Sequence, residues 1–301
     1  MKDRVHFGEW NSPGAEARFR ALEDELWEEA ADRWPAPSEA LDIPTRFGTS
    51  RAYRWDGGGD PVLLLHGATG TSLSWAPYAG ALAGRIAYAL DTIGDVGRSR
   101  QTVPVRGPGD LVTWLDETLA GLALDTVHVA GTSYGGFLGL LLAAHRPERV
   151  ASLTLLDPGG IERLHLARFL AWGTACLFAS RLPDRPRRAA GRALRMPALD
   201  DRRLLGMTLH GQRHHRVRLL PPGPLADDDL RSVAAPVLLM VGAQSEVHDV
   251  RAMVDRATAL LPDVDAEIVP GAGHALPLSH ADHCAARLVA FVAQKSNRAA
   301  P

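Results

Sequence analysis

The sequence predicts an α/β fold in which a doubly wound, mostly parallel sheet carries an inserted helical segment. Three observations support this: short continuous apolar runs, helical patterns between them, and one long stretch that interrupts the alternation. Continuous apolar runs are typical of strands buried on both faces of a parallel sheet. Their alternation with helical segments is typical of βαβ connections.

Six apolar runs are expected to form the strands of this sheet: 61–67, 86–91, 126–131, 151–157, 235–242 and 266–271. Helical patterns lie between or after them, over 109–124, 134–146, 249–261 and 280–294. An amphipathic helix is predicted over 14–34, because Phe19, Leu22 and Leu26 fall on one helical face and Pro35 ends the pattern.

Residues 158–232 break the alternation, because they contain helical patterns but no strand-like run. We therefore predict a core formed by residues 1–157 and 233–301, and a helical lid formed by residues 158–232. The lid holds 14 arginines and 7 acidic side chains, a net charge of +7 against −9 for the rest of the chain. Helices are expected within it at about 161–180, 185–195 and 200–219.

Composition excludes several classes of protein. A net charge of −2 over 301 residues gives no basic excess, so no nucleic-acid partner is expected. No apolar run approaches the roughly 18 residues of a membrane span, so no membrane partner is expected either. Cys176 and Cys284 cannot form a disulfide framework, and a cytoplasmic location is the default expectation. The sequence does not indicate an oligomeric state.

The motif G-x-S-x-G occupies residues 131–135, directly after a predicted strand and before a predicted helix. This is the setting of a nucleophile elbow, in which a strained turn exposes the serine hydroxyl at the end of the strand. Gly131 and Gly135 suit the close approach of strand and helix. We predict Ser133 as the nucleophile; the alternative is a glycine-rich turn with an incidental serine.

Two backbone N–H groups are expected to form an oxyanion hole. One follows the nucleophile, at Tyr134, and the other lies in the early loop His66–Gly70, at Ala68. Such donors stabilise the negative oxygen of a tetrahedral intermediate by about 3 kcal/mol each. His66 is expected to shape this loop rather than to transfer protons.

His274 lies in the Gly-rich loop after the last predicted strand. The chain order Ser133 then His274 is the order of the α/β-hydrolase arrangement, so His274 is the predicted general base. His210 and His214 could share a helix face, but no nearby Cys, Asp or Glu completes a metal site. We therefore expect no metal and no cofactor.

A catalytic triad also contains a carboxylate that orients the histidine. The sequence leaves the identity of this carboxylate ambiguous. It normally follows the strand after the lid, three residues past a glycine, and counting from Gly242 that position holds Ser245. Three carboxylates compete for the role. Asp157, which ends the strand before the lid, is preferred; Glu246 is the alternative, and Asp249 precedes a helix that it would cap.

Several segments together resemble α/β-hydrolase-fold enzymes, and more narrowly bacterial carboxylesterases of the naproxen-esterase type: His66-Gly67, LDTIGDVGRS at 90–99, DLVTWLDETL at 110–119, GTSYGG at 131–136 and GAGH at 271–274. The similarity runs from residue 40 to the last helix. In that family the acid position reads Gly-Glu-x-Glu, and this chain departs from it with Gly242-Ala243-Gln244-Ser245. The resemblance implies ester hydrolysis through an acyl-enzyme.

Three functions are compared on this basis. The first is a cofactor-free serine hydrolase acting on a small-molecule carboxylic ester or thioester through Ser133 and His274. The second is an acyltransferase or thioesterase of a biosynthetic pathway, for which the positive lid would suit an acidic acyl carrier protein. The third is a non-catalytic binding member of the fold, against which the retention of Ser133 and His274 argues.

Overall fold

The computed structural model describes residues 7–299. Its strands are β1 (Glu9–Trp10), β2 (Glu39–Thr45), β3 (Gly48–Trp55), β4 (Gly57–Leu65), β5 (Gly84–Leu90), β6 (Arg100–Gln101), β7 (Val127–Thr132), β8 (Val150–Leu156), β9 (His215–Arg216), β10 (Val237–Gly242) and β11 (Val264–Val269). Its α-helices are α1 (Pro13–Ala31), α2 (Pro108–Gly121), α3 (Tyr134–His145), α4 (Leu166–Ala179), α5 (Asp184–Ala193), α6 (Arg202–His214), α7 (Asp227–Arg231), α8 (Val250–Leu260), α9 (Leu276–Ser279) and α10 (Ala281–Ala299). Short 3₁₀ segments are η1 (Ser72–Tyr78), η2 (Pro147–Arg149) and η3 (Pro197–Leu199).

A single nine-stranded sheet runs through the molecule in the order β11-β10-β8-β7-β4-β5-β3-β2, with β6 paired to β3. The six strands from β11 to β5 are mutually parallel, which confirms the predicted mostly parallel sheet. They correspond to the six apolar runs of the sequence. The antiparallel strands β2, β3 and β6 were not predicted, because β2 and β3 lack a continuous apolar run.

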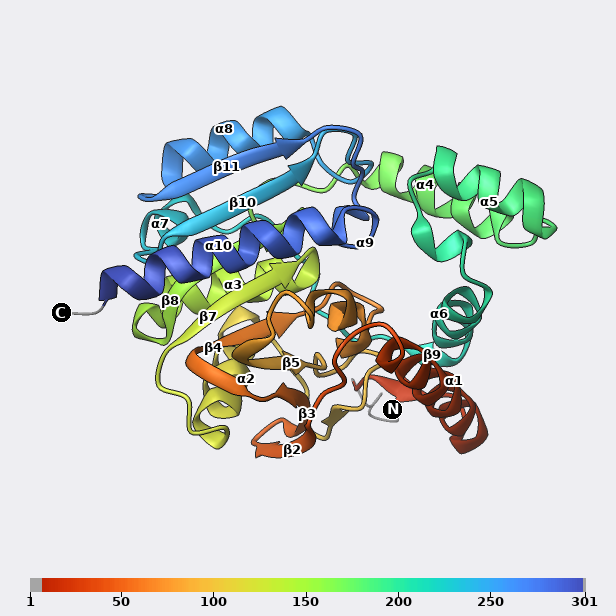
Figure 1. The fold of residues 1–301 in the computed structure, drawn as a ribbon, viewed down its shortest axis with the longest axis horizontal. Helices are drawn as coiled ribbons and strands as arrows, with labels where there is room; N and C mark the ends of the chain where they lie inside the picture. The colour runs from red at the N-terminus through yellow and green to blue at the C-terminus, as the bar shows by residue number, and fades with distance from the viewer. Residues whose placement is uncertain (1–6, 300–301) are drawn as a thin grey trace, which may run out of the picture.

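Helices cover both faces of the sheet, as a doubly wound fold requires. On one face α2, α3, α7 and α8 contribute to an apolar cluster that includes Trp114, Leu138 and Met253. On the other, η1 and α10 contribute Trp75, Tyr78 and Leu288 (Figure 1). Because the six strands are parallel, their carboxyl ends lie at one edge of the sheet. Figure 1 shows α4, α5 and α6 beyond that edge.

The insertion over residues 158–232 is mainly helical but less uniform than its sequence indicates. Its helices α4, α5 and α6 are shorter than the predicted ones, and residues 215–216 form β9, which pairs antiparallel with β1. The prediction of no strand in this segment missed β9, because its partner lies far away in sequence. At the end of the segment, α7 places Leu230 in the main core.

The first helix, α1, packs against α6 of the insertion. Ser12 caps α1, since its Oγ accepts a hydrogen bond from the Ala15 N–H at 3.2 Å. Phe19 and Leu26 of α1 form an apolar cluster with Met207 of α6. The insertion is therefore held at one end by the N-terminal helix. Within residues 7–299 no helix is long and apolar enough to cross a membrane.

Candidate active site

Ser133 occupies the turn between β7 and α3 with φ 50° and ψ −111°. This left-handed conformation is costly for a residue with a Cβ, and the surroundings hold it in place. The Ser133 N–H donates to the Leu156 carbonyl at 3.1 Å, and the Ser133 carbonyl accepts from the Gly159 N–H at 2.9 Å. The turn is therefore fixed by the neighbouring strand β8 and by the chain that follows it.

Glycines around Ser133 allow strand and helix to meet. A Cβ at Gly135 would overlap the Leu65 carbonyl oxygen, and a Cβ at Gly131 would overlap the Gly135 carbonyl oxygen. A Cβ at Gly67 would lie 3.3 Å from the Cβ of Ser133. Close approach of three backbone segments therefore explains the glycines at these places.

His274 and Asp157 lie together beside this turn. Nδ1 of His274, in the loop between β11 and α9, is 3.3 Å from Oδ2 of Asp157. Asp157 directly follows β8 and is fully buried, with φ 46°. Since β8 lies between β7 and β10, its end faces both the Ser133 turn and the loop in which the acid of such folds normally lies.

The other two candidate acids have different partners. Oε2 of Glu246 accepts a hydrogen bond from the backbone N–H of His274 at 3.0 Å, and Arg195 approaches Oε1 at 3.5 Å. Glu246 therefore holds the histidine loop rather than the imidazole. Asp249 accepts a hydrogen bond from the Ala252 N–H at 3.0 Å and so caps α8, the role that its position before a helix predicts.

Sequence reasoning missed His248, which is 1% exposed and lies beside the same carboxylate. Its Nε2 is 3.9 Å from Oδ1 of Asp157, and one nitrogen or carboxylate oxygen from each of Asp157, His248 and His274 lies within 4.8 Å of the others. Within the described residues, neither ring nitrogen of His248 has a hydrogen-bond partner. Burial lowers the pKa of His248 to about 4, so its ring is neutral at pH 7.

This buried histidine makes stability depend on pH. In the unfolded chain His248 takes up a proton near pH 6.5, whereas in the folded protein it does so near pH 4. The unfolded state therefore binds more protons between these values, and the free energy of unfolding falls as pH is lowered. His248→Gln should remove this contribution, so that the free energy of unfolding falls less between pH 7 and pH 4.5, by about 2 kcal/mol, in urea titrations at the two pH values.

Other buried groups also make the free energy of unfolding depend on pH in this range. Burial and the nearby Arg20 also lower the pKa of His215 to about 4, so it acts in the same direction. Burial raises the pKa of Asp95 to about 6, which opposes the loss as pH falls. The exposed His165→Gln is the matched control. An equal change in stability at both pH values in His248→Gln would contradict the expectation.

The predicted oxyanion donors lie next to the serine. Ala68, Tyr134 and Ser133 line one cavity together. Among the described residues, no protein group accepts a hydrogen bond from the backbone N–H of Ala68 or of Tyr134. Both donors are therefore available to a ligand oxygen.

The loop that carries Ala68 is fixed by buried polar contacts. Oδ2 of Asp95 accepts from the Thr69 N–H at 2.8 Å. His66 contacts the Gly67 carbonyl through Nδ1 at 2.7 Å and the Thr92 N–H through Nε2 at 3.0 Å. His66 thus shapes the loop, and Asp95, from the segment LDTIGDVGRS, is a second support that sequence reasoning did not single out.

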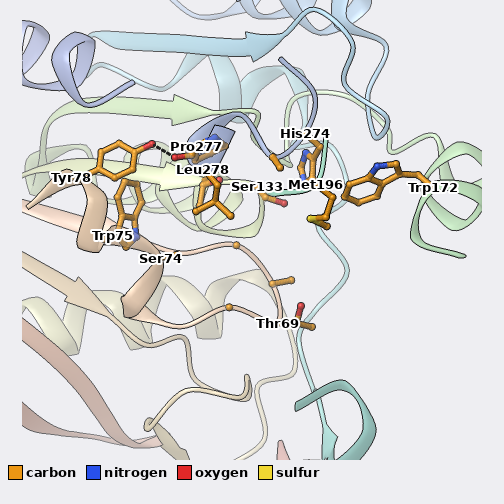
Figure 2. A pocket seen from close by; sticks show the side chains of 15 residues that line it. Thr69, Ser74, Trp75, Tyr78, Ser133, Trp172, Met196, His274, Pro277 and Leu278 are labelled. Atoms are coloured by element: carbon orange, nitrogen blue, oxygen red, sulfur yellow. Dashed lines mark hydrogen bonds between the residues drawn. The ribbon is translucent and has the colours of Figure 1, made fainter. Parts of the chain in front are cut away.

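Two cavities meet at Ser133 and His274. One, of about 220 Å³, extends toward Trp75, Tyr78 and Leu278, where the Tyr78 hydroxyl donates to the Pro277 carbonyl at 2.8 Å (Figure 2). The other, of about 520 Å³, lies under the insertion. Both linings are predominantly apolar, as in small-molecule binding sites.

Helix α4 carries five large apolar side chains that could line an acyl pocket: Phe169, Leu170, Trp172, Leu177 and Phe178. Phe169, Trp172 and Leu177 do line the larger cavity. Leu170 and Phe178 do not, and are 56% and 68% exposed. Helical spacing separates the two groups, because Phe169 and Trp172 lie on the inner face of α4 and Leu170 lies on another.

The histidine pair of α6 serves packing. The rings of His210 and His214 lie 4.6 Å apart, on one face as expected. Nε2 of His210 contacts the Ala15 carbonyl at 2.8 Å, and Nδ1 of His214 contacts the Asn11 amide at 3.0 Å. Both histidines therefore attach the N-terminal segment to the insertion.

Comparison with known proteins agrees with this geometry. Carboxylesterase YbfK of Bacillus subtilis (strain 168) is 28% identical over 300 residues, which cover 91% of this chain and 96% of that protein. The crystal structure of carboxylesterase CesB (YbfK) from Bacillus subtilis superposes with a TM-score of 0.75 at 25% identity, covering 93% of this chain and 98% of the other. Naproxen esterase from Bacillus subtilis shares the fold, with a TM-score of 0.75 at 24% identity over 91% of this chain and 98% of the other.

These relatives confirm the resemblance seen in the sequence. The model of a family described as "Alpha/beta hydrolase family" matches residues 62–289, which is more than half of the chain. The matched range includes the Ser133 turn, Asp157 and His274. The chain is a member of the alpha/beta hydrolase family.

Proposed function

We propose that this protein is a carboxylesterase that hydrolyses small-molecule esters through an acyl-enzyme on Ser133. The observation that carries the proposal is the 3.3 Å approach of His274 Nδ1 to a buried Asp157 oxygen, beside a serine in a strained turn. Carboxylesterases similar over most of the chain support the same reaction class.

In the first step the Ser133 hydroxyl oxygen attacks the ester carbonyl carbon, and Nε2 of His274 takes the hydroxyl proton. The N–H groups of Ala68 and Tyr134 stabilise the oxyanion that forms. His274 then gives its proton to the leaving alcohol, and an ester links the acyl group to Ser133. Water, activated by His274, attacks this ester and releases the acid.

Asp157 would fix the histidine during both steps. A carboxylate at Nδ1 keeps the proton on that nitrogen, so that Nε2 can accept the proton of Ser133. It also stabilises the imidazolium that forms. Full burial of Asp157 strengthens this interaction, since no water competes for its Oδ2.

The two cavities define the substrate class. They meet at Ser133 and His274, so an ester bound across the serine would place one apolar group in each. The larger cavity, of about 520 Å³, has room for the bulkier group. We infer an ester with apolar substituents on both sides of the scissile bond.

Acyl transfer or thioester cleavage uses the same site and is the second candidate. The positive charge of the insertion favours it, because an acidic acyl carrier protein would be attracted there. A cytoplasmic location stays a prediction from the sequence; Cys176 and Cys284 are both free.

The test is labelling with a fluorophosphonate followed by peptide mass spectrometry, and then a panel of esters and thioesters with and without an added alcohol. We expect one labelled residue, Ser133, and release of free acid from esters. Labelling elsewhere would contradict the nucleophile. Product appearing only as a new ester would identify a transferase.

A further inference from the structure

An apolar patch remains uncovered on the insertion. In the part of the chain that the structure describes, nine large apolar side chains are exposed, and six of them fall between residues 166 and 182: Leu166, Phe169, Leu170, Leu177, Phe178 and Leu182. Exposed fractions reach 62% at Leu166 and 68% at Phe178. Clusters of this kind mark interaction sites. Phe169 also faces the cavity that contains Ser133, so we call the other five side chains the α4 apolar patch.

Helix α4 is apolar on two faces. Leu166, Leu170 and Leu177 follow one another at helical spacing and form its outer stripe. Phe169 and Trp172 face the 520 Å³ cavity, and Leu177 borders both faces. A helix that is apolar nearly all round is normally buried. Figure 1 shows α4 and α5 projecting from the body of the molecule, so the outer stripe needs a partner that supplies an apolar medium.

Uncompensated positive charge lies beside this patch. Arg185, Arg188 and Arg192 of α5 are exposed and share one helical face, opposite the face that carries the buried Arg187. Within residues 7–299, no acidic group lies within ion-pair distance of these three or of the exposed Arg181 that follows α4. Helices α4 and α5 pack against each other, so both features belong to one projecting unit.

We propose that α4 and α5 dock this protein onto the surface of an anionic lipid bilayer. The α4 apolar patch enters the boundary between headgroups and acyl chains, and the α5 arginines pair with the lipid phosphates. The sequence predicted no membrane partner because no segment can span a bilayer, but surface docking needs no spanning segment. Exposed apolar side chains on a helix, with arginines beside them, are typical of interfacial binding.

Docking would also set the source of the substrate, and this part rests on the proposed esterase function. The inner face of α4 lines the cavity that contains Ser133, while its outer face would lie in the lipid. An ester dissolved in the bilayer would therefore be separated from the catalytic serine by a single helix. We infer that lipid-dissolved esters are the substrates.

An acidic carrier protein fits these observations less well. It would neutralise Arg185 and Arg188, but the side chains of Leu170 and Phe178 would still need an apolar cover. A lipid surface supplies both the negative charge and the apolar medium in one partner. The carrier protein is therefore treated as an outcome of the test.

The experiment is flotation of the full chain with vesicles of equimolar phosphatidylglycerol and phosphatidylcholine, compared with vesicles of phosphatidylcholine alone. Wild type and Ser133→Ala should both float with the anionic vesicles, and added salt should weaken the binding. Because Ser133→Ala lacks the nucleophile, its flotation reports docking independently of catalysis. A wild-type protein that floats with anionic vesicles but hydrolyses no ester would overturn the proposed function and leave docking standing.

Two double variants test the two halves of the surface. Leu170→Ser/Phe178→Ser and Arg185→Glu/Arg188→Glu should each lower the partition coefficient by about tenfold or more. Hydrolysis of a short water-soluble ester should stay unchanged, since none of the four side chains lines either cavity that meets Ser133. Hydrolysis of an ester dissolved in anionic vesicles should fall with the binding.

Matched controls lie elsewhere on the surface. Ile268→Ser removes an apolar side chain that is 46% exposed on β11, and Arg106→Glu/Arg251→Glu reverses two exposed arginines outside the insertion. Neither should change flotation. The proposal fails if the wild-type protein does not bind anionic vesicles. It also fails if the control variants bind these vesicles as weakly as the α4 and α5 variants do. It also fails if Leu170→Ser/Phe178→Ser only dissociates a dimer, or if an acyl carrier protein binds and vesicles do not.

Discussion

Replacing Ser133 by alanine is expected to lower kcat for ester hydrolysis by roughly 10³-fold or more, because the acyl-enzyme can no longer form. Alanine fits the turn as serine does: the backbone keeps φ 50° in either case, and the hydrogen bonds that hold the turn are made by backbone groups. The measurement is steady-state hydrolysis of a chromogenic ester by the purified variant, with thermal unfolding as a check on folding.

Ser74→Ala is the matched control for this substitution. Ser74 lines the same 220 Å³ cavity, and its hydroxyl donates only to the Thr71 carbonyl, at 2.9 Å. A loss of less than tenfold is expected there. If Ser133→Ala keeps its esterase activity, Ser133 is not the nucleophile and the glycine-rich turn has only a structural role.

Asp157→Asn should be at least as damaging, with a loss on the order of 10⁴-fold in kcat. An amide at this position can donate a hydrogen bond to Nδ1, which favours the tautomer that carries its proton on Nε2. That nitrogen could then no longer accept the Ser133 proton, and the positive imidazolium would lose its carboxylate partner. The variant keeps the shape of the buried side chain, so the rate, rather than folding, should report the change.

Glu246→Gln and Asp249→Asn are the comparisons that decide the acid. A glutamine oxygen at 246 can still accept the hydrogen bond from the His274 backbone N–H, so a loss of less than tenfold is expected. Asp249→Asn keeps a helix cap and should have little effect. If Glu246→Gln loses activity as far as Asp157→Asn, or if Asp157→Asn keeps wild-type kcat, the assignment of Asp157 is wrong.

Local pattern was enough to predict the parallel strands, because their surroundings are uniform. A strand covered by helices on both faces is apolar at most positions. β10 meets this condition throughout, and β7 and β8 depart from it only at polar residues such as His128, Ser152 and Thr154. The outer hairpin of β2 and β3 is different. In β2 only Ile43 is buried, so the sequence lacks both a continuous run and a clear alternation.

The catalytic residues also fall into two groups, those that the local sequence identifies and those that depend on the arrangement of the strands. Ser133 and His274 sit among glycines that only a tight turn requires, so the chain marks them locally. The acid is different, because the reach of a carboxylate depends on which strand lies next to which. Sequence shows Ser245 at the customary position and three candidate carboxylates, but it cannot show that Glu246 turns toward a backbone N–H. His248 was missed because only burial reveals it.

The pairing of β1 with β9 has a consequence for biosynthesis. Glu9 and Arg216 pair across 207 positions, and α1 packs on α6, which is also made late. At translation rates of about 5–20 residues per second, α1 waits about ten seconds or more for α6 and β9 of the insertion. Throughout that interval the apolar face that carries Phe19 and Leu26 can contact Leu73, Ala76 and Val96, but its Met207 partner is missing. The contacts that join α1 and β1 to the insertion can therefore form only after most of the sheet has been synthesised.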